Sequence, residues 1–94
     1  MGELEFDLQS RQVSSPDGVL TLSRRELSVF EAMAMSQGRT VSKQQLLDAI
    51  YGVGADVEEQ VIEVYISRLR KRLKPHGIGI KMQRGLGYNL QVLA

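Results

Sequence analysis

Basic and hydrogen-bonding side chains recur through residues 58–74 at a spacing that would gather them on one side of a helix. At 3.6 residues per turn, that side and its two flanks carry Gln60, Val64, Ser67, Arg68, Arg70 and Lys71. All of them except Val64 can donate a hydrogen bond. An α-helix is narrow enough to enter a DNA major groove, where such side chains reach base edges and phosphates. These residues are therefore candidate DNA contacts.

The opposite side of the same segment is apolar. Its hydrophobic residues follow the spacing i, i+4, i+7 and i+11, at Ile62, Ile66, Leu69 and Leu73. This spacing predicts a stripe that packs against a core. An ordinary solvated amphipathic helix would look the same, because lysine and arginine cover most helix surfaces. The segment alone leaves both interpretations open.

Few residues could support catalysis or metal binding. The chain has one histidine, His76, and no cysteine, which excludes disulfides, thiolate metal sites and cysteine nucleophiles. Its carboxylates are scattered and form no acid–base or nucleophile constellation. Asp56, Glu58 and Glu59 could form a metal cluster, but carboxylates at a helix start more often favour the positive end of the helix dipole. We therefore expect no enzyme activity, no cofactor and no metal.

Composition indicates one domain, residues 1–94, with its charges divided unevenly. The 43% hydrophobic and 24% charged residues are typical of a folded soluble protein. No apolar run approaches the roughly 20 residues that span a bilayer, and no signal peptide is recognisable, so we expect a cytoplasmic protein without membrane insertion. Residues 1–59 carry five Lys or Arg and ten Asp or Glu, whereas residues 60–94 carry seven and one. This polarity favours a nucleic-acid partner, although an anionic membrane surface would be attracted too.

The segments before residue 74 predict the scaffold. Residues 3–22 contain three short alternating stretches and a Pro-Asp-Gly turn at 16–18, which indicate antiparallel strands. Residues 23–74 indicate three helices, from two capping boxes, a possible third box and two terminal glycines. These signals are Ser23 with Glu26, Ser42 with Gln45, Asp56 with Glu59, Gly38 and Gly52.

Residues 78–92 predict a β-hairpin. Apolar residues alternate on both sides of the glycine-bearing loop at 84–87, which places Arg84 at or near the tip. An arginine at a hairpin tip can enter a narrow minor groove, where negative potential is concentrated. Taken alone, an exposed arginine in an ordinary turn would explain the same residues.

Four stretches together resemble the OmpR/PhoB-type winged-helix output domain of bacterial two-component response regulators. They are Leu20-Thr21 to Glu26, residues 41–47 (VSKQQLL), residues 62–73 (IEVYISRLRKRL) and residues 84–88 (RGLGY), and the resemblance runs from about Leu4 to Val92. It implies an α+β fold: a winged helix-turn-helix with an N-terminal antiparallel sheet, three helices and a C-terminal hairpin wing. It also implies sequence-specific binding to double-stranded promoter DNA during transcription regulation.

Site residues and partners follow from the resemblance position by position. Gln60, Val64, Tyr65, Ser67, Arg68 and Arg70 stand where family members touch bases or phosphates, and Arg84 matches the wing arginine. The loop Gly52 to Glu58, with Val53, Asp56 and Glu58, matches a segment through which several members contact RNA polymerase. A receiver domain and a sensor kinase in the full-length protein, and a dimer on DNA, are implied as well. The present chain would then be an excised output domain.

Several positions depart from the family pattern. Tyr51 stands where an aromatic Trp is usual, Tyr65 where a His is usual, and Met82-Gln83 where a Thr-Val precedes the wing arginine. Gln60 and Ser67 stand where some members have arginine, which leaves the preferred DNA sequence open. A winged-helix module that binds only protein, without specific DNA binding, is the alternative.

Overall fold

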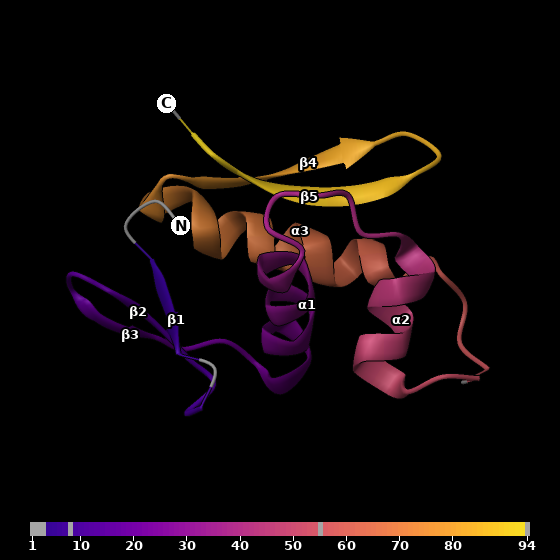
Figure 1. Ribbon diagram of the computed structural model, residues 1–94, viewed down its shortest axis with the longest axis horizontal. Helices are drawn as coiled ribbons and strands as arrows, with labels where there is room; N and C mark the ends of the chain where they lie inside the picture. The colour runs from indigo at the N-terminus through magenta and orange to yellow at the C-terminus, as the bar shows by residue number, and fades with distance from the viewer. Residues whose placement is uncertain (1–3, 8, 55, 94) are drawn as a thin grey trace.

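The computed structural model describes residues 4–7, 9–54 and 56–93, which fold into two small antiparallel sheets and three α-helices (Figure 1). In chain order the elements are β1 Glu5–Asp7, β2 Gln12–Ser15, β3 Gly18–Leu20, α1 Arg24–Met35, α2 Lys43–Tyr51, α3 Val61–Leu73, a 3₁₀ turn Lys74–His76, β4 Ile78–Gln83 and β5 Gly87–Val92. β1, β2 and β3 form one sheet, and β4 pairs with β5. The predicted α+β winged-helix fold is confirmed.

The N-terminal sheet is a scaffold at one end of the molecule (Figure 1). Its three strands confirm the predicted antiparallel arrangement, and Leu8 lies outside the described residues. The turn predicted at 16–18 joins β2 to β3, with Ser15 opposite Gly18. Val13 is buried, and the Phe6 ring stacks on Phe30 of α1 with 5.7 Å between ring centroids. These contacts fix the sheet to α1.

Both predicted capping boxes are present, because they depend only on residues three positions apart. Ser23 and Ser42 each accept a hydrogen bond from the backbone N–H of the third helical residue, and that residue's side chain accepts one in return. Gly52 ends α2 as predicted. The predicted end of α1 at Gly38 is late, since the helix ends at Met35 and Gln37 already has a φ of 53°.

The start of the third helix was predicted too early. α3 begins at Val61, and its cap residue Gln60 makes no side-chain capping bond. The proposed box between Asp56 and Glu59 is therefore wrong, because Asp56 lies in irregular chain several residues before the helix. At its other end α3 passes into the 3₁₀ turn that contains Pro75.

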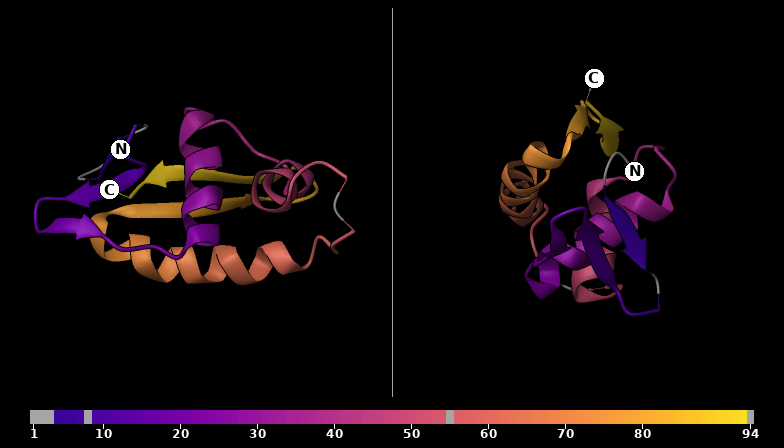
Figure 2. Two further views of the ribbon diagram at one scale, coloured as in Figure 1. Left: turned by 90° about the horizontal axis from the view of Figure 1, so that it is seen from below. Right: turned by 90° about the vertical axis from the view of Figure 1, so that its left-hand side faces the viewer.

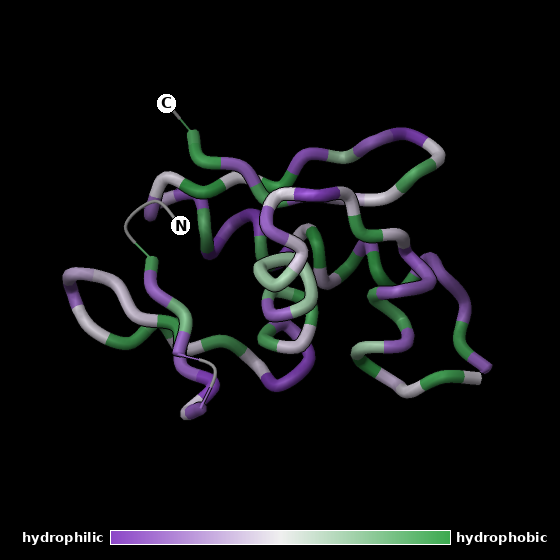
Figure 3. Tube along the Cα trace, viewed as in Figure 1, coloured by the Kyte–Doolittle hydropathy of each residue, from purple (hydrophilic) through white to green (hydrophobic). Residues whose placement is uncertain are grey.

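The core is built around the apolar side of α3. Ile62, Ile66, Leu69 and Leu73 are at most 1% exposed, which confirms the predicted stripe. Hydrophobic and hydrophilic residues alternate along the helices accordingly (Figure 3). No helix in the described part of the chain is long and apolar enough to cross a membrane.

The wing is joined to the segment before α2 by a close backbone contact. Val41 and Tyr88 exchange two backbone hydrogen bonds of 2.7 and 2.9 Å, so that Val41 extends the hairpin by one antiparallel bridge. Gly87 lies directly beneath Val41: a Cβ atom at this position would be 2.0 Å from the Val41 carbonyl oxygen. The approach therefore requires a residue without a side chain, and it fixes the wing relative to α2.

Candidate nucleic-acid interface

The solvent-facing side of α3 gathers most of the predicted contact residues. Gln60, Glu63, Val64, Ser67, Arg68 and Lys71 line one shallow surface depression. All of them are exposed, including the apolar Val64 at 46%. Glu63 is the member that the sequence analysis did not single out. The surface can offer hydrogen bonds, two cations, one carboxylate and one apolar group to a ligand.

Arg68 and Arg70 have different environments, although both lie on flanks of α3. The Arg70 Nε donates a 3.2 Å hydrogen bond to the backbone carbonyl of Ile80, so this guanidinium connects α3 to β4. Arg68 makes no hydrogen bond or ion pair to any residue in the described part of the chain. Its guanidinium is therefore available to an external partner.

Tyr65, which stands where family members touch bases or phosphates, is largely buried and contacts α1 and α2. Its side chain is only 8% exposed, and its hydroxyl accepts a 3.1 Å hydrogen bond from Nη1 of Arg25 in α1. The hydroxyl of Tyr51 in α2 lies 3.4 Å from that of Tyr65. The hydrogen bond with Tyr51, followed by that with Arg25, lowers the pKa of Tyr65, while the hydrogen bond with Tyr65 raises the pKa of Tyr51. Tyr65 thus accepts the hydrogen bond from Arg25, while either hydroxyl can donate in the contact between Tyr51 and Tyr65.

A buried carboxylate fixes the start of α1 to α3. Glu26 is 3% exposed; one carboxylate oxygen accepts the backbone N–H of Ser23, and the other lies 3.4 Å from Nε of Arg72. Arg72 also donates a 2.7 Å hydrogen bond to the carbonyl of Thr21. Because a buried carboxylate needs such partners, α3 is held in one orientation relative to α1.

A second, exposed ion pair joins the start of α2 to α3. The Lys43 Nζ lies 3.2 Å from the Glu63 carboxylate, and this hydrogen bond is the main reason why the pKa of Lys43 is raised. Both side chains remain accessible, so the pair contributes little to stability. Glu63 partly neutralises the charge of Lys43 at the edge of the α3 surface.

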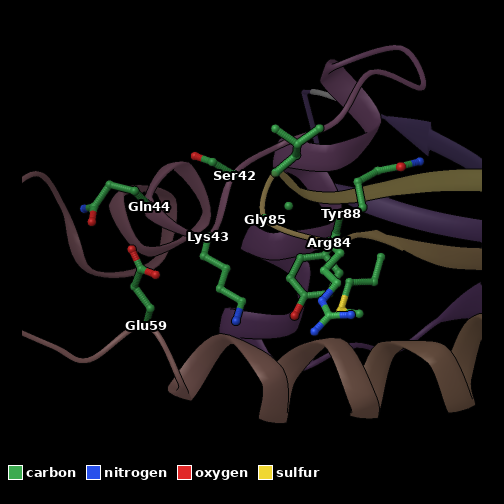
Figure 4. Close-up of a pocket in the computed structure, with 11 residues that line it drawn as sticks. Ser42, Lys43, Gln44, Glu59, Arg84, Gly85 and Tyr88 are labelled. Atoms are coloured by element: carbon green, nitrogen blue, oxygen red, sulfur yellow. The ribbon is translucent and has the colours of Figure 1, made fainter.

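The wing tip is exposed and carries Arg84, as predicted. Arg84 makes no hydrogen bond or ion pair with a described residue, and its neighbour Leu86 is 68% exposed. A cavity of about 380 Å³ lies between the wing, the start of α2 and Glu59 of the loop before α3. Figure 4 shows Lys43 and Arg84 extending from its rim toward the ribbon of α3. The wing, the start of α2 and Glu59 in the loop before α3 therefore border the same hollow.

The loop between α2 and α3 lies at the opposite end of the molecule from the N-terminal sheet (Figure 1). Val53 is 90% exposed, and Asp56 and Glu58 are exposed too. Within the described residues no group of three potential ligands could hold a metal ion. The loop offers an apolar and an acidic surface away from the basic residues of α3.

Sequence reasoning missed Arg25, Tyr51 and Lys43 as neighbours of α3. The hydrogen bonds that connect Arg25 to Tyr51 and Tyr65 span 26 and 40 residues, and the Lys43–Glu63 pair spans 20. Periodicity reports which side of one helix is apolar, but it carries no information about such distant partners. The only sign of this cluster in the sequence was the pair of tyrosines at positions 51 and 65, where Trp and His are usual in the family.

Comparisons with known proteins connect this geometry to a family. A family model described as "Transcriptional regulatory protein, C terminal" matches residues 17–90. The phosphate regulon transcriptional regulatory protein PhoB of Rhizobium meliloti is 33% identical over 92 residues, which cover 96% of this chain and 40% of that protein. The probable transcriptional regulatory protein y4xI of Sinorhizobium fredii is 36% identical, covering 97% and 41%. The chain thus spans about two fifths of the length of these relatives.

Solved structures agree with the sequence comparisons. The RstA DNA-binding domain of Klebsiella pneumoniae, solved in complex with the RstA box, is 31% identical with a TM-score of 0.76, covering 94% of this chain and 90% of that one. The AdeR DNA-binding domain shares the fold, with a TM-score of 0.82 at 23% identity and coverage of 98% and 97%. The chain therefore belongs to the family of C-terminal domains of transcriptional regulatory proteins, the OmpR/PhoB-type winged-helix family that its motifs resemble.

Proposed function

We propose that the chain binds double-stranded promoter DNA in a sequence-specific manner, with the exposed face of α3 in the major groove and Arg84 of the wing in the minor groove. The observation that carries this proposal is that α3 has one buried apolar side and one exposed basic side. One side is buried to 1% exposure or less, while the other presents Arg68 and Lys71, whose side chains have no hydrogen-bond or ion-pair partner among the described residues. Side chains of this kind in this position suit base edges and phosphates.

The surroundings of α3 support the same function. In the right-hand view of Figure 2, α3 is seen end-on between the β4–β5 hairpin on one side and α1 and α2 on the other. A helix placed in a major groove has one sugar-phosphate strand on each side, so both sets of elements would face DNA backbone. The family is one of transcriptional regulators rather than enzymes, and the related RstA domain was solved with DNA.

Binding to DNA can be measured directly. A duplex selected from random sequences should bind in fluorescence anisotropy with an affinity that falls linearly with salt on a log–log plot. A shuffled duplex of the same composition should bind roughly 10³-fold or more weakly. Failure to select any sequence would instead favour a module that binds only protein.

Arg84→Ala is expected to weaken binding most for sites with an A·T-rich flank. Narrow minor grooves attract arginine through their shape and potential, and the Arg84 side chain is unpaired within the described residues. Arg11→Ala is the control, because it removes an equal charge at the N-terminal sheet, where Arg11 pairs with Glu31. Equal losses on A·T-rich and G·C-rich flanks would leave Arg84 only a nonspecific charge role.

The loop at residues 52–58 is proposed as a contact for RNA polymerase. Val53 is the most exposed large hydrophobic residue described, and Asp56 adds an exposed negative charge to the loop. In the full-length regulator, Val53→Ala with Asp56→Ala should abolish transcription activation in cells but leave DNA affinity intact. Loss of both activities together would indicate a structural loop.

The relatives are longer than this chain, and the remainder of the full-length protein is inferred from them. We infer a receiver domain that a sensor kinase regulates, and two copies of the present domain bound to neighbouring half-sites as a tandem repeat about one helical turn apart. Footprints at saturating protein should then cover two half-sites. Protection of a single half-site would contradict the dimeric arrangement.

A further inference from the structure

The two flanks of α3 are covered by different parts of the protein. On one flank Arg70 contacts Ile80 of the wing strand β4. On the other, Tyr65 contacts Arg25 at the start of α1, and the hydroxyl of Tyr51 at the end of α2 lies beside them. We call Arg25, Tyr51 and Tyr65 the Arg25 cluster. It lies on the flank of α3 that faces away from the wing.

The guanidinium of Arg25 is held in a fixed position by this cluster. Nη1 donates to the hydroxyls of Tyr65 and Tyr51 at 3.1 and 3.3 Å, and the central carbon lies 4.8 Å from the centroid of the Tyr51 ring. Arginine has several rotatable bonds, and ordering them costs conformational entropy before any ligand binds. Contacts from two helices therefore preorganise this side chain.

Three of the five N–H donors of Arg25 have no acceptor among the described residues, and its charge has no carboxylate partner there. Both hydrogen bonds leave from Nη1, so the N–H groups of Nε and Nη2 have no described acceptor. The three ion pairs found among the described residues do not include Arg25, and its side chain is exposed. Nε and Nη2 form the fork that binds carboxylate or phosphate in a bidentate manner.

We propose that Arg25 binds a backbone phosphate on the DNA strand that borders the major groove opposite the wing, and that Tyr51 and Tyr65 position its guanidinium. This inference rests on the proposed DNA binding by α3. A helix in the major groove has a second backbone strand beyond its wing-distal flank, and the Arg25 cluster occupies that flank. The unoccupied donors of Arg25 match the chemistry of a phosphodiester.

The matched comparison is Arg25→Gln against Arg24→Gln. Arg24 is the adjacent residue of the same helix turn, is exposed, and makes no side-chain hydrogen bond or ion pair with a described residue. We expect Arg25→Gln to lower affinity about tenfold or more and to reduce the slope of log affinity against log salt by about one unit. Arg24→Gln should leave the slope unchanged. Equal slopes in both variants would overturn the proposal.

Failure of this inference can be distinguished from failure of DNA binding itself. If the wild-type protein shows no salt-dependent binding, the proposed function fails; if it binds and Arg25→Gln leaves the slope unchanged, only the Arg25 site fails. On a selected duplex, a neutral methylphosphonate at one phosphate should weaken the wild-type protein but not Arg25→Gln. Finding no such position on the wing-distal strand would contradict the assignment.

The positioning role of Tyr65 has a separate readout. Tyr65→Phe keeps the buried ring and removes only the hydroxyl, so the fold should persist. It should weaken DNA binding severalfold in the wild-type background and have no effect when Arg25 is already Gln, because its contribution passes through Arg25. Additive losses in the two backgrounds would show that Tyr65 acts independently of Arg25.

Discussion

Arg68→Ala is expected to weaken DNA binding strongly while leaving the free energy of unfolding nearly unchanged. If Arg68 contacts guanine with both guanidinium donors, the loss is roughly 1 to 3 kcal/mol and the preference at one base pair is relaxed. Its guanidinium has no hydrogen bond or ion pair among the described residues, so little stability depends on it. Anisotropy titrations on duplexes with single-base changes, together with urea unfolding, measure both quantities.

Arg70→Ala provides the contrast, because Arg70 also serves the fold. Its Nε donates to the carbonyl of Ile80, and losing that bond should reduce the free energy of unfolding by about 0.5 to 1.5 kcal/mol. Arg68 makes no such bond with a described residue, so the two arginines differ in what they contribute to stability. Unaltered DNA affinity in both variants would contradict the assignment of α3 as the recognition helix.

Gly87→Ala is expected to produce the largest loss of stability. Gly87 has a φ of 139°, and an added Cβ would lie 2.0 Å from the Val41 carbonyl oxygen, so the backbone of the wing or of the segment before α2 must shift. Conformational strain and overpacking together should cost about 2 to 5 kcal/mol. Chemical denaturation followed by circular dichroism gives the difference in free energy.

Gly85→Ala is the matched control for Gly87→Ala. Gly85 also has a positive φ, 78°, but nothing lies within 4 Å of its added Cβ. Only the conformational cost of about 1 to 2 kcal/mol should remain. If both variants lose the same stability, the close approach between Gly87 and Val41 does not determine how the wing is held.

The features predicted correctly from the sequence are those encoded over a few residues. The boxes at Ser23 and Ser42 need only a partner three positions away, and the apolar stripe of α3 repeats with every turn. Asp56 satisfied the same local pattern without forming a cap, because the chain remains irregular until Val61. A local pattern permits a helix start, but packing of the following turn decides where it occurs.

Sequence periodicity predicted which residues share the exposed surface of α3, because that grouping depends on the helix alone. Gln60 and Lys71 share one surface, as periodicity indicated. Tyr65 and Arg70 make internal contacts that periodicity did not predict. The flanks of the helix are covered by α1, α2 and β4, and the sequence does not reveal which element covers which flank. Arg25 was missed for the same reason, since its partners are distant in the chain.

The central claim, that α3 and the wing bind DNA, is tested most directly by titrating ¹⁵N-labelled protein with a selected duplex and following the NMR signals of each residue. Saturable shifts should be largest at Gln60, Val64, Ser67, Arg68, Lys71 and Arg84. Signals of β1, β2 and β3 should change little, because these strands lie at the end of the molecule away from the wing tip. Shifts confined to those strands, or none with any duplex, would contradict the account.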